Sequence, residues 1–435
     1  MTRATTRPVA VPPAAAPPDS RALRFLWIID LDHRSRMRHG GNLRWFSLSR
    51  ELLLRGHYVY FAVNRHPLDE LAGRRQYLEE MRRDGVISGF VELDYVVPRR
   101  LSRLAHLLTY PLLVGLCLRR YQAQAVAGLR SAIARHGIDL CVVSDRALLF
   151  VIPSLVQDLP VVVDWADSLV LHGRRNLRLL RGRGPLATMR SLRNLVAHYV
   201  RERYYTRRSS TSLVVSPVDK ACVDGVSGLP GQTRVLLNGI DMPAAPPTVP
   251  KNPGRLIFTG NMDFPPNYQA ALWFIDEVFP LITRERPEVV FVVAGRNPGP
   301  ELRSRAGERV VIAGSVDDMI EEIARSALYV APLISGGGFK NKVLEAIASG
   351  TYVVATPLAV EFLHGSLRDD LLLGETPGDF ARQVLTFLGD RPHYDARLPR
   401  LQACLRREFT WAGRATELLD LASGLLERPG RRGGP

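Results

Sequence analysis

The stretch from Ala331 to Pro357 limits most strictly what this chain can fold into. A short apolar run opens it, and a loop containing Gly336–Gly338 and two lysines follows. An apolar pattern with helical spacing then begins at Val343 and ends at Gly350, and Tyr352–Ala355 is a second buried strand. A strand, a glycine loop with cations, a helix start and another strand are the parts with which α/β proteins hold a phosphate group.

Apolar runs and amphipathic segments alternate along the rest of the chain. Strands are expected at Leu23–Ile29, His57–Val63, Gly89–Leu93, Leu140–Val143, Val161–Asp164, Ser212–Ser216, Arg255–Thr259, Val289–Ala294 and Val310–Ala313. Helices are expected at Asn42–Leu54, Pro67–Arg83, Leu116–Arg135, Leu186–Arg207, Asn267–Leu281, Asp317–Ser326, Phe380–Leu388 and Ala412–Leu426. The alternation predicts an α/β fold: two doubly wound parallel-sheet (Rossmann-like) domains that face each other across a cleft.

A proline-rich stretch without periodicity, Met242–Gly254, is the best candidate for a domain boundary. With 435 residues the chain is long enough for two domains. The expected organisation is a disordered Ala/Pro/Thr tail at 1–20, a first domain at 21–241, a linker at 242–254, a second domain at 255–403, a terminal helix at 404–428 that packs back toward the first domain, and a basic tail at 429–435.

Positive charge is concentrated in one part of the first half. Between Arg99 and Arg208 there are nineteen Arg against six Asp and Glu, in a chain whose formal net charge is +15. The region suits an anionic partner such as a membrane surface, a lipid phosphate or nucleic acid, and a merely solvated arginine-rich face is the open alternative. Nucleic acid is the least favoured of these partners, because no recognition-helix pattern accompanies the charge.

The segment Arg99–Arg120 is mostly apolar and has arginines at both ends. It suits an interfacial helix beside a lipid-linked acceptor, or a buried helical hairpin whose arginines reach outward. No run approaches the roughly 20 apolar residues that span a bilayer. The four cysteines show no metal-binding spacing, as expected in a reducing compartment. The expected location is cytoplasmic, with a peripheral position on the inner face of the membrane left open.

Short motifs are spread along both halves of the chain: Gly40-Gly41, Gly56-His57, Asn238-Gly239-Ile240-Asp241, Phe258-Thr259-Gly260, Pro266-Asn267, Trp273-Phe274, Gly314-Ser315-Val316-Asp317-Asp318 and Lys342-Val343-Leu344-Glu345-Ala346 with Gly350. In these motifs the chain resembles a family 4 glycosyltransferase, of the retaining, exopolysaccharide-type branch with the GT-B fold. The resemblance implies an acceptor-side first domain, a second domain that binds a nucleotide diphosphate sugar as co-substrate, and no required cofactor or metal. Neither a dinucleotide fingerprint nor a P-loop is present.

Two positions depart from the pattern that the resemblance implies. The first acid of the Glu-x7-Glu pair falls on Gly337, and Glu345 fits the second. Gly260-Asn261 stands where the family often has Gly-Arg to grip the diphosphate. Lys340 and Lys342 are therefore expected to neutralise the leaving diphosphate at the helix start, and Arg296 is a further candidate for this contact. Exposed lysines in a turn are the alternative.

The other candidate residues divide into a donor-binding set and a set of acid/base candidates. Glu345 is expected to accept hydrogen bonds from ribose hydroxyls, or only to complement the helix dipole. His172, Asp145, Asp164 and Asp167 lie at or near the ends of predicted strands and are the acid/base candidates, with a merely polar surface position as the alternative for His172. The expected donor-binding residues are Gly40, Gly41, Gly260, Asn261, Arg296, Val316, Gly337 and Gly338. For the glycines, close helix or turn packing is the alternative.

The function that follows is transfer of a hexose from a nucleotide diphosphate sugar to a hydroxyl acceptor, with retention, in polysaccharide or glycoconjugate biosynthesis. Such an enzyme is a hexosyltransferase, and its acceptor would be a hydroxyl compound such as a lipid-linked saccharide. Three alternatives stay open: a secondary-metabolite glycosyltransferase, a nucleotide-sugar epimerase of the same fold, and a non-catalytic basic binding module.

Overall fold

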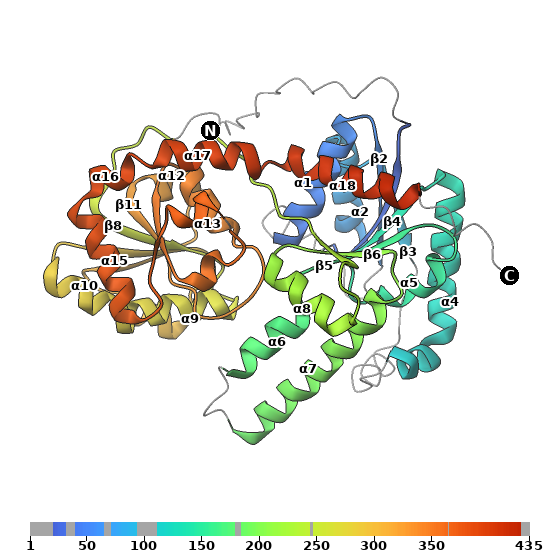
Figure 1. Ribbon diagram of the computed structural model, residues 1–435, viewed down its shortest axis with the longest axis horizontal. Helices are drawn as coiled ribbons and strands as arrows, with labels where there is room; N and C mark the ends of the chain where they lie inside the picture. The colour runs from blue at the N-terminus through green and yellow to red at the C-terminus, as the bar shows by residue number, and fades with distance from the viewer. Residues whose placement is uncertain are drawn as a thin grey trace. The chain divides into compact units, whose positions relative to one another are not determined.

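The computed structural model shows two compact α/β units (Figure 1). The residues that it describes are 21–31, 40–64, 71–93, 111–178, 184–243, 247–363 and 365–427. One unit combines the described parts of Met1–Leu104, Gly115–Val163 and Leu419–Pro435, and the other combines those of Ala105–Val114 and Asp164–Leu418. Both predicted tails and most of the Arg99–Arg120 segment lie outside the described residues.

A seven-stranded sheet forms from the first half of the chain in the order β3-β2-β1-β4-β5-β6-β7. Its strands are β1 (Arg24–Ile29), β2 (Tyr58–Asn64), β3 (Gly89–Leu93), β4 (Leu140–Val143), β5 (Val161–Ala166), β6 (Thr211–Val214) and β7 (Thr233–Val235). The registered pairs of neighbours are parallel. All four residues of β4 are buried, because helices cover a parallel sheet on both faces and leave no polar side.

The helices of this half follow the strands in sequence. They are α1 (Gly40–Leu54), α2 (Leu71–Arg83), α4 (Pro111–His136), η2 (Leu149–Val151), α5 (Ile152–Leu155), α6 (Leu169–Arg178), α7 (Pro185–Thr206) and α8 (Pro217–Ser227). Local chemistry sets their ends. The Ser216 hydroxyl caps α8 by accepting from the Asp219 N–H, and Gly228 stops that helix with a φ of 68°. Helix α1 begins at Gly40, two residues earlier than predicted.

The second sheet has six parallel strands in the order β10-β9-β8-β11-β12-β13. They are β8 (Asn252–Thr259), β9 (Val290–Ala294), β10 (Val310–Gly314), β11 (Ser326–Ala331), β12 (Tyr352–Ala355) and β13 (Leu372–Leu373). Strand β8 starts inside the stretch predicted as a linker. The prediction of two doubly wound, parallel-sheet folds is confirmed.

Helices lie on both faces of this six-stranded sheet, with α9, α10 and α15 on one and α12, α13 and α17 on the other (Figure 1). The helices and helical turns of this half are α9 (Pro265–Trp273), η3 (Phe274–Val278), α10 (Phe279–Glu285), α11 (Pro300–Arg303), α12 (Met319–Ala324), α13 (Asn341–Ala348), η4 (Pro357–Val360), α14 (Ser366–Asp369), α15 (Pro377–Gly389), α16 (Arg391–Asp395), α17 (Leu398–Glu408) and α18 (Trp411–Leu426). Their apolar faces and the strands share one core, in which the largest fully buried side chains include Phe258, Phe274, Phe291 and Phe380.

The helix predicted as one piece at Asn267–Leu281 is interrupted. Helix α9 widens into the π-helical turn η3 before α10 begins. Pro280 explains the change, because it has no N–H to donate and its ring would clash with the carbonyl one turn earlier. The wider turn carries Phe274 into the core, where its ring centroid lies 4.4 Å from that of Phe291.

Candidate functional site

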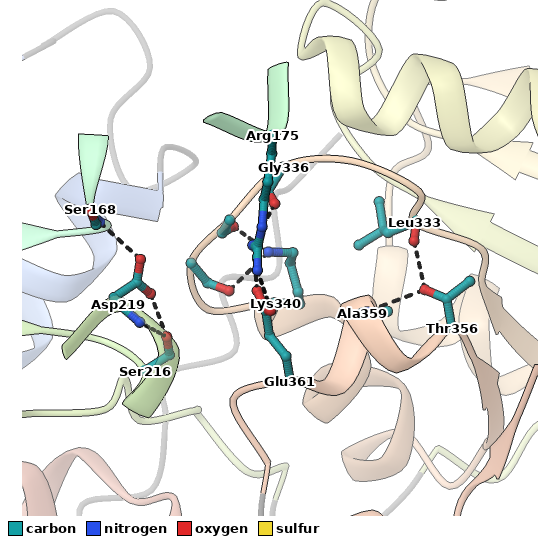
Figure 2. Close-up of polar contacts among 12 residues, drawn as sticks. Ser168, Arg175, Ser216, Asp219, Leu333, Gly336, Lys340, Thr356, Ala359 and Glu361 are labelled. Atoms are coloured by element: carbon teal, nitrogen blue, oxygen red, sulfur yellow. Dashed lines mark hydrogen bonds and ion pairs between the residues drawn. The ribbon is translucent and has the colours of Figure 1, made fainter. Parts of the chain in front are cut away.

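The loop between β11 and α13, residues 332–340, is held from several sides. At its start, the Thr356 hydroxyl donates to the Leu333 carbonyl at 2.6 Å and accepts from the Ala359 N–H at 3.2 Å (Figure 2). The Ser335 hydroxyl donates to the Gln269 side-chain oxygen at 2.7 Å. The start of the loop is therefore tied both to the next strand–helix connection and to helix α9.

Arg175, on helix α6, binds the middle of this loop. Its Nη1 donates to the Gly336 carbonyl at 2.8 Å and to Glu361 Oε1 at 2.7 Å, and its Nη2 donates to Glu361 Oε2 at 2.6 Å (Figure 2). The ion pair is two-pronged, and both side chains are less than a fifth exposed. Such a pair has a defined geometry, so the loop carbonyl is held at a fixed distance from α6.

Asp167 lies against the last glycine of the loop. A Cβ added to Gly338 would stand 2.0 Å from Asp167 Oδ1, and Gly338 has a φ of 73°. Only glycine satisfies both the space and the backbone conformation here. Asp167 itself follows a tight turn in which its N–H donates to the Trp165 carbonyl at 2.8 Å and Ala166 has a φ of 55°. A non-glycine residue with positive φ stores strain, which the surrounding contacts must offset.

Lys340 is buried at the end of the loop. Its ammonium donates to the carbonyls of Gly337 and Gly338, the latter at 2.8 Å. Burial lowers the pKa of Lys340, against the opposing effect of nearby acids that include Asp167 and Glu361. The Lys340 ammonium is therefore hydrogen-bonded within its own loop. Its predicted contact with a diphosphate stays a prediction.

Lys342, in the first turn of α13, lies against residues of two other elements. Its ammonium donates to Asn267 Oδ1 at 2.5 Å and stands 4.8 Å from the centroid of the Phe258 ring. The Asn267 amide donates in turn to the Asn261 carbonyl at 2.9 Å. Burial, and after it the positive charge of Lys340, lower the pKa of Lys342 to about 7. A lysine with so low a pKa gains its charge readily when an anion arrives.

Gly260 makes the contact between Lys342 and Asn267 possible. A Cβ at this position would stand 2.6 Å from Asn267 Nδ2 and 3.0 Å from Lys342 Nζ. The structure thus brings together Gly260, Asn261 and Lys342, which the sequence predicted separately, and adds Asn267 as the residue that joins them.

Glu345 follows Lys342 by three residues on α13, so the two side chains lie on neighbouring positions of one helix face. The Glu345 side chain is exposed. Desolvation by the surrounding protein raises its pKa, the charge of Lys342 lowers it, and the charge of Asp241 raises it. An accessible carboxylate beside a partly buried cation is suited to accept hydrogen bonds from ligand hydroxyl groups.

Three strands that are followed by or end at glycine, β8, β9 and β10, are neighbours in the six-stranded sheet. The Gly260 N–H donates to the Ala294 carbonyl at 3.0 Å, and the Gly295 N–H donates to the Gly314 carbonyl at 2.6 Å. Gly295 has a φ of 143°, and a Cβ there would stand 1.8 Å from the Gly260 carbonyl oxygen. Arg296 and Val316 follow these glycines and are partly buried. Ligands of doubly wound sheets bind at the carboxyl ends of strands such as these.

The remaining predicted residues lie elsewhere. His172 is on α6, one turn before Arg175, and is partly buried. Gly40 and Gly41 form the first turn of α1, in the other compact unit. Their predicted donor contacts stay predictions.

The sequence analysis missed the contacts that Arg175, Glu361 and Asp219 make. Arg175 was one of many arginines in a basic stretch, and nothing local distinguished it. Asp219 accepts from the Ser168 N–H at 2.9 Å and from the Ser216 hydroxyl (Figure 2). The three glycines in a row could have indicated such contacts. A loop whose residues have no side chains exposes its backbone carbonyl groups, and these need hydrogen-bond donors from other elements.

No group of three or more His, Cys, Asp or Glu with the spacing of a metal site occurs in the part of the chain that the structure describes. In the described ranges, Cys141, Cys222 and Cys404 form no disulfide bond. Within the same described ranges, no helix combines the length and the apolar composition that crossing a membrane requires.

Residues 253–390 match the family model described as glycosyl transferases group 1. This segment contains the glycine loop, Lys342, Glu345 and Glu361. A phosphatidyl-myo-inositol mannosyltransferase of Mycolicibacterium smegmatis is 34% identical over 114 residues, which are 25% of this chain and 29% of that protein. The match therefore spans less than a third of the relative's length.

Solved structures resemble the chain over nearly its whole length. HepE of Anabaena, crystallised with UDP and glucose, has a TM-score of 0.60 at 14% identity and covers 93% of this chain and 100% of its own. Sucrose-phosphate synthase of Thermosynechococcus elongatus has a TM-score of 0.64 at 16% identity and covers 93% of this chain and 99% of its own. At such identities the likeness concerns the fold, which is the GT-B fold of two parallel-sheet domains.

Proposed function

We propose that the protein is a glycosyltransferase that moves a hexose from a nucleotide diphosphate sugar to a hydroxyl acceptor. The observation that carries the proposal is the pair of Lys342 and Glu345 on α13. A partly buried lysine of lowered pKa and an exposed carboxylate stand at the start of the helix that follows the glycine loop. Both residues lie in the segment that matches the glycosyltransferase family model.

Each residue of this group has a distinct task in such a reaction. Lys342 and the positive end of the α13 dipole neutralise the diphosphate as its bond to the sugar lengthens. Glu345 accepts hydrogen bonds from ribose hydroxyls. Lys340 and Arg175 hold the loop carbonyls, so the loop keeps one shape while the donor binds.

We further propose that the transfer retains the configuration of the sugar, as in family 4 glycosyltransferases. In a front-face reaction the acceptor attacks from the side that the diphosphate leaves, through a short-lived ion pair. This route requires no nucleophile from the protein, and it places the main demand on stabilising the leaving diphosphate. The cations beside the glycine loop meet that demand.

The names of the relatives support sugar transfer in the assembly of polysaccharides or glycoconjugates. The mycobacterial relative is named for mannosyl transfer to phosphatidyl-myo-inositol, and the Anabaena protein was crystallised with UDP and glucose. We therefore propose UDP-glucose as the first donor to test and a saccharide, carried on a lipid at the inner face of the membrane, as the acceptor class.

A donor panel followed by a product assay tests the proposal. A nucleotide diphosphate sugar present at 100 times its Kd should stabilise the protein by roughly 2.7 kcal/mol, which a thermal shift detects. Mass spectrometry should then show sugar transferred to the acceptor. Glu345→Ala is expected to remove transfer while the protein stays folded, and Glu375→Ala, an exposed acid outside the site, should transfer normally.

Two results would contradict the proposal. A folded Glu345→Ala protein with full transferase activity would show that the carboxylate takes no part. Conversion of the donor without any acceptor would identify an epimerase instead.

A further inference from the structure

Helix α7 exposes large apolar side chains along one face. Leu186 is 81% exposed, Met189 68%, Leu192 53%, Val196 44% and Tyr199 40%. The five residues follow one another at intervals of three or four, so they form a stripe along the helix. They are called here the outer face of α7. At 1.5 Å per residue the stripe is about 20 Å long.

Other residues of α7 pack in the fold. Leu195 lies against α6, since a Cβ on Gly173 would stand 3.0 Å from its Cδ1. Glu202 is fully buried and accepts from the Ser168 hydroxyl at 3.1 Å. Helices α6 and α7 lie side by side in Figure 1. The core thus accounts for these residues of α7 and leaves the outer face without a role.

The charged side chains that lie among the apolar residues of the stripe are positive. From Arg174 to Arg208 the chain has eleven Arg and a single acid, Glu202. That acid is buried, so it does not offset the surface charge. Arg190 and Arg193 are exposed and lie on α7 among the apolar residues of the stripe.

We propose that the outer face of α7 docks on an anionic phospholipid membrane. The aliphatic side chains would enter the boundary between headgroups and acyl chains, and the arginines would pair with lipid phosphates. A second copy of this chain is a poorer occupant, because two such faces would bring two sets of arginines together. The proposal rests on the surface of α7 alone and does not require the transferase activity.

Vesicle sedimentation with the full-length protein tests this docking. The probes are neutral phosphatidylcholine vesicles and vesicles with about 30% phosphatidylglycerol, each at low and high salt and without any sugar donor. The protein should bind the anionic vesicles, and salt should weaken that binding. Arg190→Gln with Arg193→Gln should weaken it about thirtyfold, at roughly 1 kcal/mol per arginine.

Separate variants test how much the apolar side chains of the outer face contribute to vesicle binding. Leu186→Ser with Met189→Ser and Leu192→Ser should lower vesicle affinity by about tenfold or more at either salt concentration. The control is Val311→Ser with Ile320→Ser, which changes two similarly exposed residues, 41% and 44%, on other elements. It should bind like the unchanged protein. Since all these positions are exposed, the variants should keep the circular dichroism and Tm of the parent.

Three outcomes would overturn the proposal. Failure of the parent protein to sediment with either kind of vesicle would show that the face is no membrane site. Equal binding by the parent and the triple serine variant would place the lipid contact elsewhere. Loss of a dimer on the same substitutions, seen by sedimentation velocity, would assign the face to a second copy. Because no donor is present, none of these results depends on whether the protein transfers sugar.

Discussion

Arg175 and Glu361 are 186 residues apart in the sequence and form a bidentate ion pair. The Arg175 guanidinium also donates to the Gly336 carbonyl. The pair joins helix α6 to the turn after β12 and the glycine loop. Its guanidinium satisfies three acceptors with two nitrogen atoms, a geometry that lysine cannot reproduce. The shape of the proposed donor loop therefore depends on residues outside the loop itself.

Removing both partners of this pair should cost less unfolding free energy than the sum of the two single removals. Arg175→Ala leaves the Glu361 carboxylate and the Gly336 carbonyl without their donor, and we expect a loss of about 1–3 kcal/mol in unfolding free energy. The double variant Arg175→Ala/Glu361→Ala should lose less than the sum of the single changes. Thermal unfolding of the four proteins measures the coupling. Strict additivity would show that the pair contributes nothing.

Gly338→Ala should disturb the loop most strongly among single small changes. The added Cβ would stand 2.0 Å from the Asp167 carboxylate, and the residue would need a φ of 73°. We expect a lower Tm, by the equivalent of about 1–3 kcal/mol, and a loss of donor binding. The control is Gly225→Ala on α8, where nothing lies within 4 Å of the new Cβ. Gly225→Ala should leave the Tm unchanged or raise it slightly. If Gly338→Ala and Gly225→Ala changed the Tm equally, the close contact between Gly338 and Asp167 would not matter for stability.

Much of the fold follows from local patterns in the sequence. The apolar run Leu140–Val143 and the run Gly89–Leu93 are strands with the predicted bounds. Strand Leu140–Val143 lies inside the parallel sheet and is buried on both faces, so its sequence is continuously apolar and easy to recognise. Glycines that end strands, such as Gly260 and Gly314, likewise mark the edge of the sheet where ligands bind.

Other features depend on contacts that no local pattern encodes. Strand β7 has the sequence Thr-Arg-Val and β13 has two residues, too short for any period to appear. The break in the helix at Phe274 depends on Pro280, whose effect is felt one turn earlier. Lys340 looked like a free cation because the sequence does not show that its ammonium turns back to the loop carbonyls.

The pKa of Lys342 predicts how donor binding depends on pH. In the free protein this pKa is lowered to about 7, so the side chain is charged below pH 7 and neutral above it. A bound diphosphate favours the charged form. Donor Kd should therefore rise as the pH rises through 7, and should be about tenfold higher at pH 8 than at pH 6.

Calorimetry in buffers of different ionisation enthalpy measures directly how many protons the protein takes up when the donor binds. Binding at pH 8 should take up close to one proton, because Lys342 must gain its charge, and binding at pH 6 should take up almost none. Lys342→Arg keeps a charged side chain at both values, so its proton uptake should vanish even where its affinity changes. Uptake that persists in this variant would assign the proton to another group.

Glu202 should make the protein less stable as the pH rises from about 4.5 to 7. Burial, with the negative charge of Asp219 as a smaller cause, raises the pKa of Glu202 to about 7 from 4.5 in the unfolded chain. The folded state thus holds a proton that the unfolded state releases, and stability falls by about 3 kcal/mol over this interval. Glu202→Gln cannot titrate, so its Tm should fall less between pH 5 and pH 8. Glu277→Gln, at an exposed position, should follow the parent. Parallel Tm curves for Glu202→Gln and the parent would show that Glu202 is already charged in the fold.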